Sequence, residues 1–210
     1  MPRLTDLTLL DLLAAFRSPE PTPGGGSAAA LAGALGASLL AMVGGLPKSH
    51  AKTEEDTERL AAAQAQCARI ADRLAVLVDR DSEAYDMVVA AYALPKASEE
   101  DKQSRSRQIQ AALRAATDAP LEVMRACGDA IEQGVVVAEL GNRNAASDVQ
   151  VGLELLLAAL RGARLNVEVN LGMLKDAAYV ALVGEEIARL TAAAEHEVTV
   201  AREKAGSRML

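Results

Sequence analysis

Apolar residues recur at steps of three and four through most of the chain, which is the spacing of one helical face. The longest such ladder runs from Leu60 to Tyr92, with Ile70, Leu74 and Leu77 in its middle. No stretch alternates apolar and polar residues for long, so the pattern predicts helices and no sheet. The expected helices cover residues 5 or 6 to 16, 27–44, 53–93, 98–117, 120–140, 147–173 and 176–204.

Several expected helix boundaries carry specific signals. Residues 98–101 have the arrangement of a capping box, and Pro120 suits the first position of a new helix. Gly141 suits a helix end, and Ser147 with Asp148 suits the cap of the helix that follows. These signals divide the second half of the chain into four helices.

The composition favours the same fold class. Half of the 210 residues are hydrophobic but only 2% are aromatic, and Trp is absent. A core of Ala, Leu and Val favours closely packed helices over a sheet. We expect one all-α domain over residues 1–210, a bundle of long antiparallel helices with a glycine-rich loop near its N-terminus.

Charge and cysteine content narrow the function. The net charge is −7 and no basic block stands out, which argues against nucleic-acid binding. Cys67 and Cys127 match no metal or redox spacing, which favours two buried thiols in a reducing cytoplasm. His50 and His196 lie far apart without ligand-like neighbours, so no metal site is expected.

The uncharged run 28–47 is nearly long enough to cross a bilayer. It consists mainly of Ala and Gly, which insert weakly, and no second run of this kind follows. The N-terminus carries acids within its apolar run and does not read as a signal peptide. We therefore expect the central helix of a cytoplasmic bundle and no membrane partner.

The segment Pro21–Ser27 reads Pro-Thr-Pro-Gly-Gly-Gly-Ser and leads into that uncharged run. Its prolines fix the approach, its glycines free the backbone, and Ser27 is expected to cap the following helix. Backbone N–H groups at the positive end of a helix suit a carbonyl, carboxylate or phosphate. Taken alone, such a loop is more often structural than functional.

Asp81 interrupts the apolar ladder, lying on the face that Leu77 and Tyr85 share, whereas Asp79 falls on the polar face. A carboxylate in an apolar seam is costly unless it is paired, and burial would raise its pKa toward the range useful for proton transfer. Two interpretations stay open. Asp81 is a catalytic acid–base, or it meets solvent or an arginine at this turn.

Asn166 and Asn170 stand four residues apart on one helical face. Buried amides commonly cross-link helices, but with Asn142 and Asp148 they would also line a polar cleft for a heterocycle. Lys96 is a candidate anion contact or an ordinary surface lysine.

These motifs together resemble the cyclodeaminase/cyclohydrolase family of folate enzymes. The resemblance runs in order from the first loop to about residue 176, over most of the chain. The family includes the C-terminal domain of formiminotransferase-cyclodeaminase and stand-alone methenyltetrahydrofolate cyclohydrolases. The matching segments are 21–27, Asp81 with 83–85, 94–96, 141–142 with 147–148, and Asn166-Val167-Glu168-Val169-Asn170.

The resemblance implies a helical homodimer that binds folate near the glycine-rich loop and uses no metal or redox cofactor. The family's catalytic aspartate falls at Asp81. Residues 45–50 depart from a basic segment found in many members, which leaves the contacts to the substrate's glutamate tail open. The residues expected to bind substrate are Pro23, Gly24, Gly25, Gly26, Ser27, Lys96, Asn142, Asp148, Asn166 and Asn170.

Three functions follow as hypotheses. The first is hydrolysis of 5,10-methenyltetrahydrofolate to 10-formyltetrahydrofolate, with Asp81 as the general base. The second is cyclodeamination of 5-formiminotetrahydrofolate with loss of ammonia, in which the same carboxylate moves protons. The third is a non-catalytic helical protein that binds a ligand or a partner, which an ordinary Asp81 pKa would favour.

Overall fold

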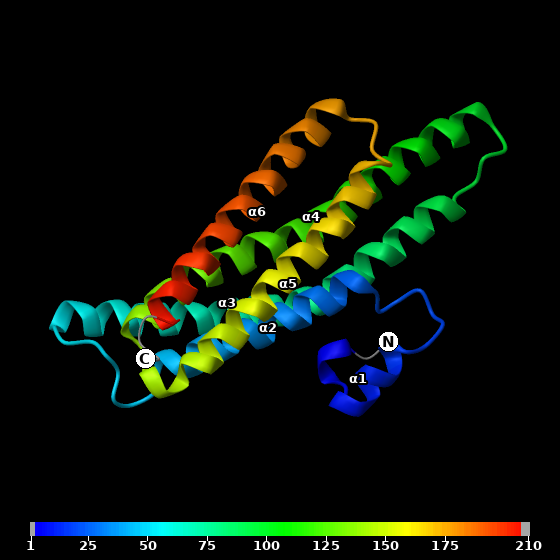
Figure 1. Ribbon diagram of the computed structural model, residues 1–210. Coiled ribbons are helices and arrows are strands. Elements are labelled where there is room, and N and C mark those ends of the chain that lie inside the picture. The colour runs from blue at the N-terminus through cyan, green and yellow to red at the C-terminus, as the bar shows by residue number, and fades with distance from the viewer. Residues whose placement is uncertain (1–2, 207–210) are drawn as a thin grey trace.

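A computed structural model describes residues 3–206 of the chain, without side-chain detail at the last of these. The described residues form helices and no strands, so the expected all-α bundle is confirmed. Figure 1 shows the long helices lying alongside one another and α1 set to one side of them. The elements are η1 (Leu4–Asp6), α1 (Leu9–Phe16), α2 (Gly25–Gly44), α3 (Glu54–Ala93), α4 (Glu99–Leu140), η2 (Arg143–Ala145), α5 (Ala146–Leu171) and α6 (Ala177–Gly206).

Helix α2 is the centre of the bundle and packs against α3, α4 and α5. Its composition of small residues allows close approach: a Cβ on Gly36 would lie 2.6 Å from the Gly152 carbonyl oxygen of α5. α2 is also the one described helix long and apolar enough to span a membrane. More than half of that apolar stretch is buried against its neighbours, which accounts for the absence of charge.

The direction of the helices follows from their contacts. The start of α2 meets Val78 of α3 and Asn166 of α5, whereas its end meets Gln64 of α3. α2 therefore runs antiparallel to both α3 and α5, and these two run parallel to each other. This arrangement places the late turns of α3 and α5 beside the glycine-rich loop (Figure 1).

The prediction of separate helices over 98–117 and 120–140 is wrong, because α4 continues through Pro120. Proline has no N–H, so the carbonyl of Ala116, four residues earlier, loses its helical partner. The Asn170 amide of α5 donates a hydrogen bond of 2.8 Å to that carbonyl oxygen. A tertiary contact therefore replaces the missing helical bond, which sequence periodicity could not reveal.

Three other boundary predictions are also wrong. The first helix begins at Leu9 with Thr8 as its cap, because residues 4–6 form a separate 3₁₀ turn. α5 begins at Ala146, and no side chain caps it. Ser27 is the third residue of α2 and not its cap, which is Gly24. By contrast, the capping box at Ser98 and the helix end at Gly141 are confirmed.

Candidate active site at the start of α2

The first turn of α2 presents backbone donors that the helix itself does not use. The first bond of the helix runs from the Ala28 N–H to the Gly24 carbonyl at 3.1 Å, so the preceding N–H groups lie outside the ladder. The Ser27 N–H donates to Oδ2 of Asp81 at 3.0 Å. No described residue accepts a hydrogen bond from the N–H of Gly25 or Gly26. Gly25 is exposed, so its N–H suits a ligand oxygen.

The Asp81 carboxylate approaches α2 so closely that only glycine fits at position 26. A Cβ built on Gly26 would lie 2.0 Å from Oδ1 and 2.7 Å from Oδ2 of that carboxylate. Gly24 and Gly25 have no such restriction, since a Cβ on Gly25 would meet Asn166 Nδ2 at an ordinary 3.7 Å. The three glycines therefore have different reasons to be present, and one of them seats the carboxylate on the helix terminus.

The Ser27 hydroxyl is fully buried and has three oxygen neighbours. It donates to the Val78 carbonyl oxygen at 2.8 Å, while Asp81 Oδ2 and the Ser82 hydroxyl each lie at 3.3 Å. One hydroxyl has one proton, so the shortest contact takes it and the backbone N–H remains the firm bond to Asp81. Ser82 was missed from the sequence, although its place next to Asp81 was a signal.

Asp81 is half-buried, and burial raises the pKa of its carboxyl above the ordinary value of 3.8. The hydrogen bonds from Ser27 oppose this shift without cancelling it. Between residues 3 and 206, no lysine or arginine forms an ion pair with Asp81, and Oδ1 accepts no hydrogen bond. The interpretation of Asp81 as one half of an arginine salt bridge is therefore wrong for the described chain. The site has a carboxylate with one oxygen fixed and one available.

Asp79 was expected on the polar face of its helix but is buried. The N-terminal segment covers it: the Leu4 N–H and the Thr5 hydroxyl both donate to its carboxylate, and Arg3 lies 3.7 Å away. The prediction failed because the covering residues are about 75 positions distant in sequence. Asp79 anchors the start of the chain.

Asn166 and Asn170 take different places despite their common helical face. Asn166 lies beside Gly25, and its amide donates to the Gly162 carbonyl of its own helix at 3.0 Å. Its side-chain amide, with Nδ2 as the atom nearest Gly25, is thus one wall of the site. Asn170 is one turn further along and cross-links α5 to α4 through Ala116.

The turn at 141–145 lies at the opposite end of α2, where Gly141 meets Val43. Asn142 there donates to the Pro47 carbonyl at 2.7 Å and accepts from the Asn144 N–H at 2.9 Å. Asp148 lies 18 residues before Asn166 on α5, which at 1.5 Å per residue is about 27 Å away. One chain therefore does not bring Asn142 or Asp148 to Asp81.

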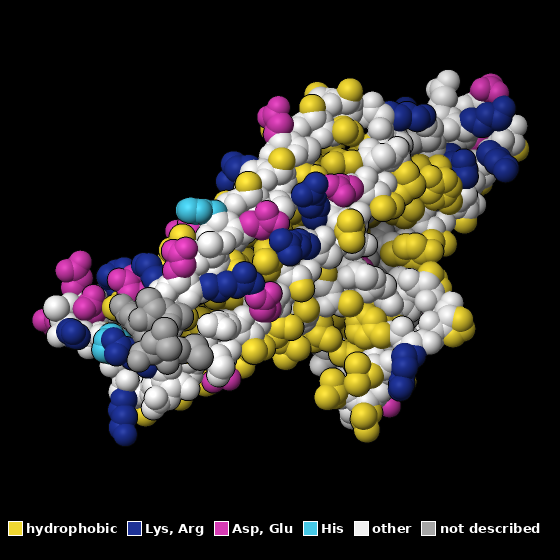
Figure 2. Space-filling model, in the orientation of Figure 1, with side chains coloured by type: hydrophobic (Ala, Val, Ile, Leu, Met, Phe, Trp, Pro, Cys, Tyr) yellow, Lys and Arg dark blue, Asp and Glu magenta, His cyan; other side chains and the backbone are white. Residues whose placement is uncertain are grey.

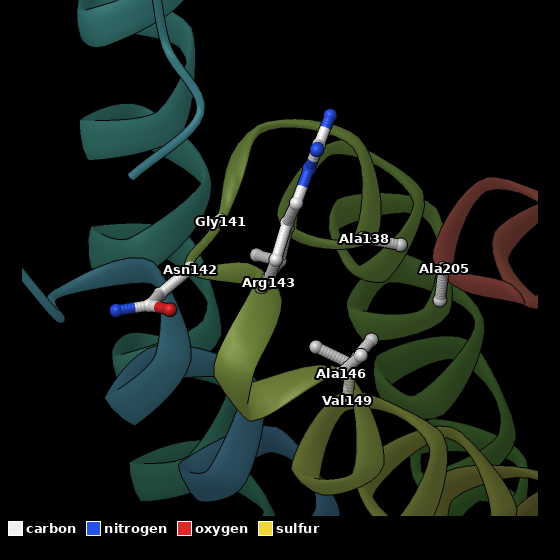
Figure 3. A pocket seen from close by; sticks show the side chains of 8 residues that line it. Ala138, Gly141, Asn142, Arg143, Ala146, Val149 and Ala205 are labelled. Carbon is white, nitrogen blue, oxygen red and sulfur yellow. The ribbon is translucent and has the colours of Figure 1, made fainter. Parts of the chain in front are cut away.

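Figure 3 shows this turn from close by, with the side chains of Asn142 and Arg143 pointing apart. The hollow beside them is about 10 Å³, room for one water molecule. A folate-sized ligand does not fit there within one chain.

Lys96 and Pro23 complete the predicted set. Lys96 lies in the turn after α3, beyond Ala93, which is about 18 Å along the helix from Asp81. Pro23, joined to Thr22 by a cis peptide bond, leads directly into Gly24. The structure thus gathers Pro23–Ser27, Asp81 and Asn166 into one place and leaves the other predicted residues elsewhere. Across residues 3–206, no three His, Cys, Asp or Glu side chains gather as metal ligands.

Comparison with known proteins places this chain in a family. A family profile described as formiminotransferase-cyclodeaminase matches residues 8–189. A methenyltetrahydrofolate cyclohydrolase of Methylorubrum extorquens is 42% identical over 82% of this chain and 81% of its own. A formimidoyltransferase-cyclodeaminase of Gallus gallus is 32% identical over 80% of this chain, which spans only 31% of that relative's length.

The fold has a solved counterpart as well. The crystal structure of a formiminotetrahydrofolate cyclodeaminase from Thermotoga maritima superposes with a TM-score of 0.82. It is 27% identical, and the match covers 98% of both chains. The resemblance read from the motifs is confirmed: this chain belongs to the formiminotransferase-cyclodeaminase family.

Proposed function

We propose that this protein hydrolyses 5,10-methenyltetrahydrofolate to 10-formyltetrahydrofolate, with Asp81 as the general base. The observation that carries the proposal is the half-buried carboxylate seated on the start of α2 with one oxygen available. The 42% identity to a methenyltetrahydrofolate cyclohydrolase supports the choice of substrate.

The chemistry of this substrate suits a site with few functional groups. The methenyl bridge is an amidinium-like cation and is already electrophilic, so a water molecule needs only placement and removal of its proton. An anionic Asp81 attracts the cation and accepts the proton. The raised pKa makes the carboxylate a stronger base than an ordinary aspartate.

We propose that hydrolysis proceeds in two steps, addition of water and opening of the ring. Water oxygen bonds to the methenyl carbon as Asp81 Oδ1 takes one of its protons, giving a neutral carbinol and a protonated carboxyl. The bond from that carbon to N5 then breaks, N5 receives the proton from Asp81, and the carbinol proton leaves to solvent as the formyl C=O forms. The exposed Gly25 N–H would stabilise the developing oxygen charge. The reaction needs only water besides the substrate, so we propose no added cofactor.

Cyclodeamination is the second candidate, because the solved Thermotoga maritima structure is titled as a formiminotetrahydrofolate cyclodeaminase. In that reaction the same carboxylate would move protons during ring closure and loss of ammonia. A purely non-catalytic protein is disfavoured, since relatives at 42% and 32% identity are both named as enzymes.

We also propose that the protein works as a cytoplasmic homodimer. The outward faces of α2 and α5, which pack side by side, expose large apolar side chains. Leu35, Val151, Leu165 and Val169 are each more than half exposed. Figure 2 shows apolar side chains gathered over this part of the surface. A contiguous exposed patch of this kind is typical of a protein interface. Light scattering should give twice the chain mass, and Leu35→Glu with Leu165→Glu should give monomers.

A two-fold axis across this face would bring the Asn142 and Asp148 end of a second copy toward Asp81. Asn142 and Asp148 of one copy would then contribute to the site around Asp81 of the other copy. Mixing inactive Asp81→Asn and Asp148→Asn proteins after joint unfolding and refolding should then restore part of the activity. Absence of restoration would place Asp148 outside the site.

The decisive experiment compares wild type with Asp81→Asn on methenyltetrahydrofolate, following loss of the ultraviolet absorbance of the methenyl bridge. Asn keeps an acceptor for the Ser27 N–H, so we expect a folded protein whose turnover falls at least ~100-fold, the range of one acid–base group. Asp86→Asn, on the same helix but exposed, is the matched control and should be fully active. Ammonia release from formiminotetrahydrofolate separates the two candidates, and near-normal turnover by Asp81→Asn would overturn the role of the carboxylate.

A further inference from the structure

The side chain of Ser27 is enclosed by protein at the back of the site. It is fully buried, and the backbone N–H of the same residue is taken by Asp81 Oδ2 at 3.0 Å. From its place in the glycine-rich segment we expected Ser27 to bind substrate. Since neither its hydroxyl nor its N–H faces a ligand, any part that Ser27 takes in the reaction passes through Asp81.

The position of the Ser27 hydroxyl proton follows from the contact distances. The distance to the Val78 carbonyl oxygen, 2.8 Å, is ordinary for an O–H donor, whereas Asp81 Oδ2 and the Ser82 hydroxyl are both at a long 3.3 Å. The single proton therefore lies on the Val78 side. The hydroxyl oxygen keeps two lone pairs, and these face Ser82 and Asp81.

Ser82 reinforces this orientation. Its contact with Ser27 needs one donor, and because the Ser27 proton is already used, the Ser82 hydroxyl donates. Val78, Asp81 and Ser82 all belong to one turn of α3, so a single rigid element surrounds the Ser27 hydroxyl. Turning the Ser27 proton toward Asp81 would break the bond to Val78 and displace the Ser82 proton.

This orientation changes the electrostatic effect of Ser27 on Asp81. As a donor to the carboxylate, the hydroxyl would lower the pKa of Asp81. With its proton on Val78, it instead places the negative end of its dipole beside Oδ2. That arrangement disfavours the anionic carboxylate and favours the acid protonated at Oδ1.

Charged groups do not account for the basicity of Asp81. Burial is the main cause of its raised pKa, and no charged residue between positions 3 and 206 is among the causes. Glu83 and Tyr85, on the same helix, are exposed. The charged groups on the neighbouring turns and elements pair with one another: Arg3 with Asp79, Arg80 with Glu122 of α4, and Arg164 with Glu168 of α5.

We propose that Ser27 is a positioning residue: by giving its proton to the Val78 carbonyl, it turns a lone pair toward Asp81 and strengthens the hold of that carboxyl on a proton. The inference rests on the proposed function, in which Asp81 takes a proton from water and later returns it to N5. A carboxylate with a second donor would be a weaker base and would take the proton less readily. Ser27 thus sets the basicity of the site without touching the folate.

A direct titration of Asp81 tests the orientation without any turnover. The probe is carbon NMR of protein labelled in its aspartate carboxyl groups, with the Asp81 signal assigned by its absence from Asp81→Asn. Ser27→Ala removes the hydroxyl and keeps the backbone N–H, and the Val78 carbonyl keeps its helical donor, the Ser82 N–H, so the variant should fold. We expect the pKa of Asp81 to fall. The ratio of protonated to ionised carboxyl at a given pH should drop about fivefold, the scale of one hydrogen bond.

Two further variants make the titration specific. Ser27→Cys, whose sulfur is a weak acceptor, should lower the pKa of Asp81 in the same direction and gives a second reading of the site. Ser38→Ala is the matched control, because it removes an exposed hydroxyl of the same helix that donates to the Ala34 carbonyl at 2.7 Å. It should leave the titration of Asp81 unchanged.

Kinetics then tests the positioning role. In Ser27→Ala the acidic limb of kcat/KM for methenyltetrahydrofolate should move to lower pH and kcat should fall, while KM stays within about twofold because the hydroxyl does not meet the substrate. A raised KM with unchanged kcat would show that Ser27 contacts the substrate and would overturn the proposal.

The sign of the titration shift decides the orientation. A higher pKa of Asp81 in Ser27→Ala and Ser27→Cys would show that the hydroxyl donates to the carboxylate, and an unchanged pKa would show that it has no effect; either result refutes the inference. Failure of wild type to turn over methenyltetrahydrofolate would contradict the proposed reaction instead, and the titration would still report which way the Ser27 proton points.

Discussion

Asp81 Oδ2 accepts a hydrogen bond of 3.0 Å from the backbone N–H of Ser27, a residue 54 positions away in the sequence. This bond joins the late part of α3 to the first turn of α2 and fixes one carboxylate oxygen at the positive end of a helix dipole. The other oxygen lies against the space where Gly26 lacks a side chain. A charged group is thus held near the surface at an energetic cost, which is typical of functional sites.

That cost predicts how stability depends on pH. Burial raises the folded-state pKa of Asp81 above 3.8, so the carboxyl favours folding only while it is protonated. Its contribution is complete below the unfolded pKa and is lost as the pH rises through the folded pKa. The Asp81→Asn variant does not ionise at this position, so it does not lose this stability as the pH rises. Urea unfolding should therefore show the variant gaining stability relative to wild type as the pH rises above 3.8, until the folded-state carboxyl is fully ionised. A constant difference over that range would contradict the raised pKa.

Gly25 and Gly26 should respond oppositely to alanine. Gly26→Ala puts a methyl group into the Asp81 carboxylate and should cost about 3 kcal/mol of unfolding free energy, the upper part of the range for overpacking. Gly25→Ala meets only an ordinary contact and should leave stability unchanged or raise it by about 0.5 kcal/mol. Denaturant titration measures both. If the Gly25 N–H binds substrate, Gly25→Ala should still raise KM, and similar losses of stability in both variants would refute this account of the glycines.

Asn170 should matter for stability because of Pro120. Asn170→Ala leaves the half-buried Ala116 carbonyl without a donor and should cost about 1 kcal/mol. In a Pro120→Ala background the new N–H can bond that carbonyl, so the same Asn170 change should cost less than half as much. A double-mutant cycle measured by thermal or urea unfolding checks this coupling. Additive effects would show that Asn170 acts otherwise.

Asp79 should control the docking of the N-terminal segment. Replacing it with alanine removes the acceptor of the Leu4 N–H and the Thr5 hydroxyl. We expect hydrogen exchange over residues 4–8 to speed up at least tenfold, while exchange in the middle of α3 and α2 stays within about twofold. Asp72→Ala, an exposed acid on the same helix, is the control. Faster exchange throughout the bundle would mean that Asp79 supports the core itself.

Both cysteines should resist thiol reagents in the folded protein. Cys67 and Cys127 are fully buried, and burial raises the pKa of the Cys67 thiol to about 12 and that of Cys127 further. At about pH 8 neither is a thiolate, so an aromatic disulfide reagent should modify neither thiol until denaturant is added. Prompt reaction of one thiol under native conditions would indicate local opening around α3 for Cys67 or around α4 for Cys127.

Helical periodicity by itself determined the all-α class and most helix boundaries, and it singled out Asp81 as a candidate site residue. These properties depend on residues near one another in sequence, such as the ladder from Leu60 to Leu77, all of which is buried. The same ladder failed beyond Asp81, where Tyr85 and Tyr92 are exposed, because no helix of residues 3–206 covers them at the end of the α3–α4 hairpin. Periodicity identifies a face but not what packs against it.

Tertiary structure alone decided which polar residues meet. Only the packing of α2 between α3 and α5 shows that Asn166 joins Asp81, that Asn170 supports Pro120, and that Asn142 and Asp148 lie about 27 Å or more away. Asp79 and Pro120 were misread for one physical reason: a buried charge or a missing N–H is tolerated when a distant segment supplies the partner. Sequence spacing cannot show a bond between residues more than 50 positions apart.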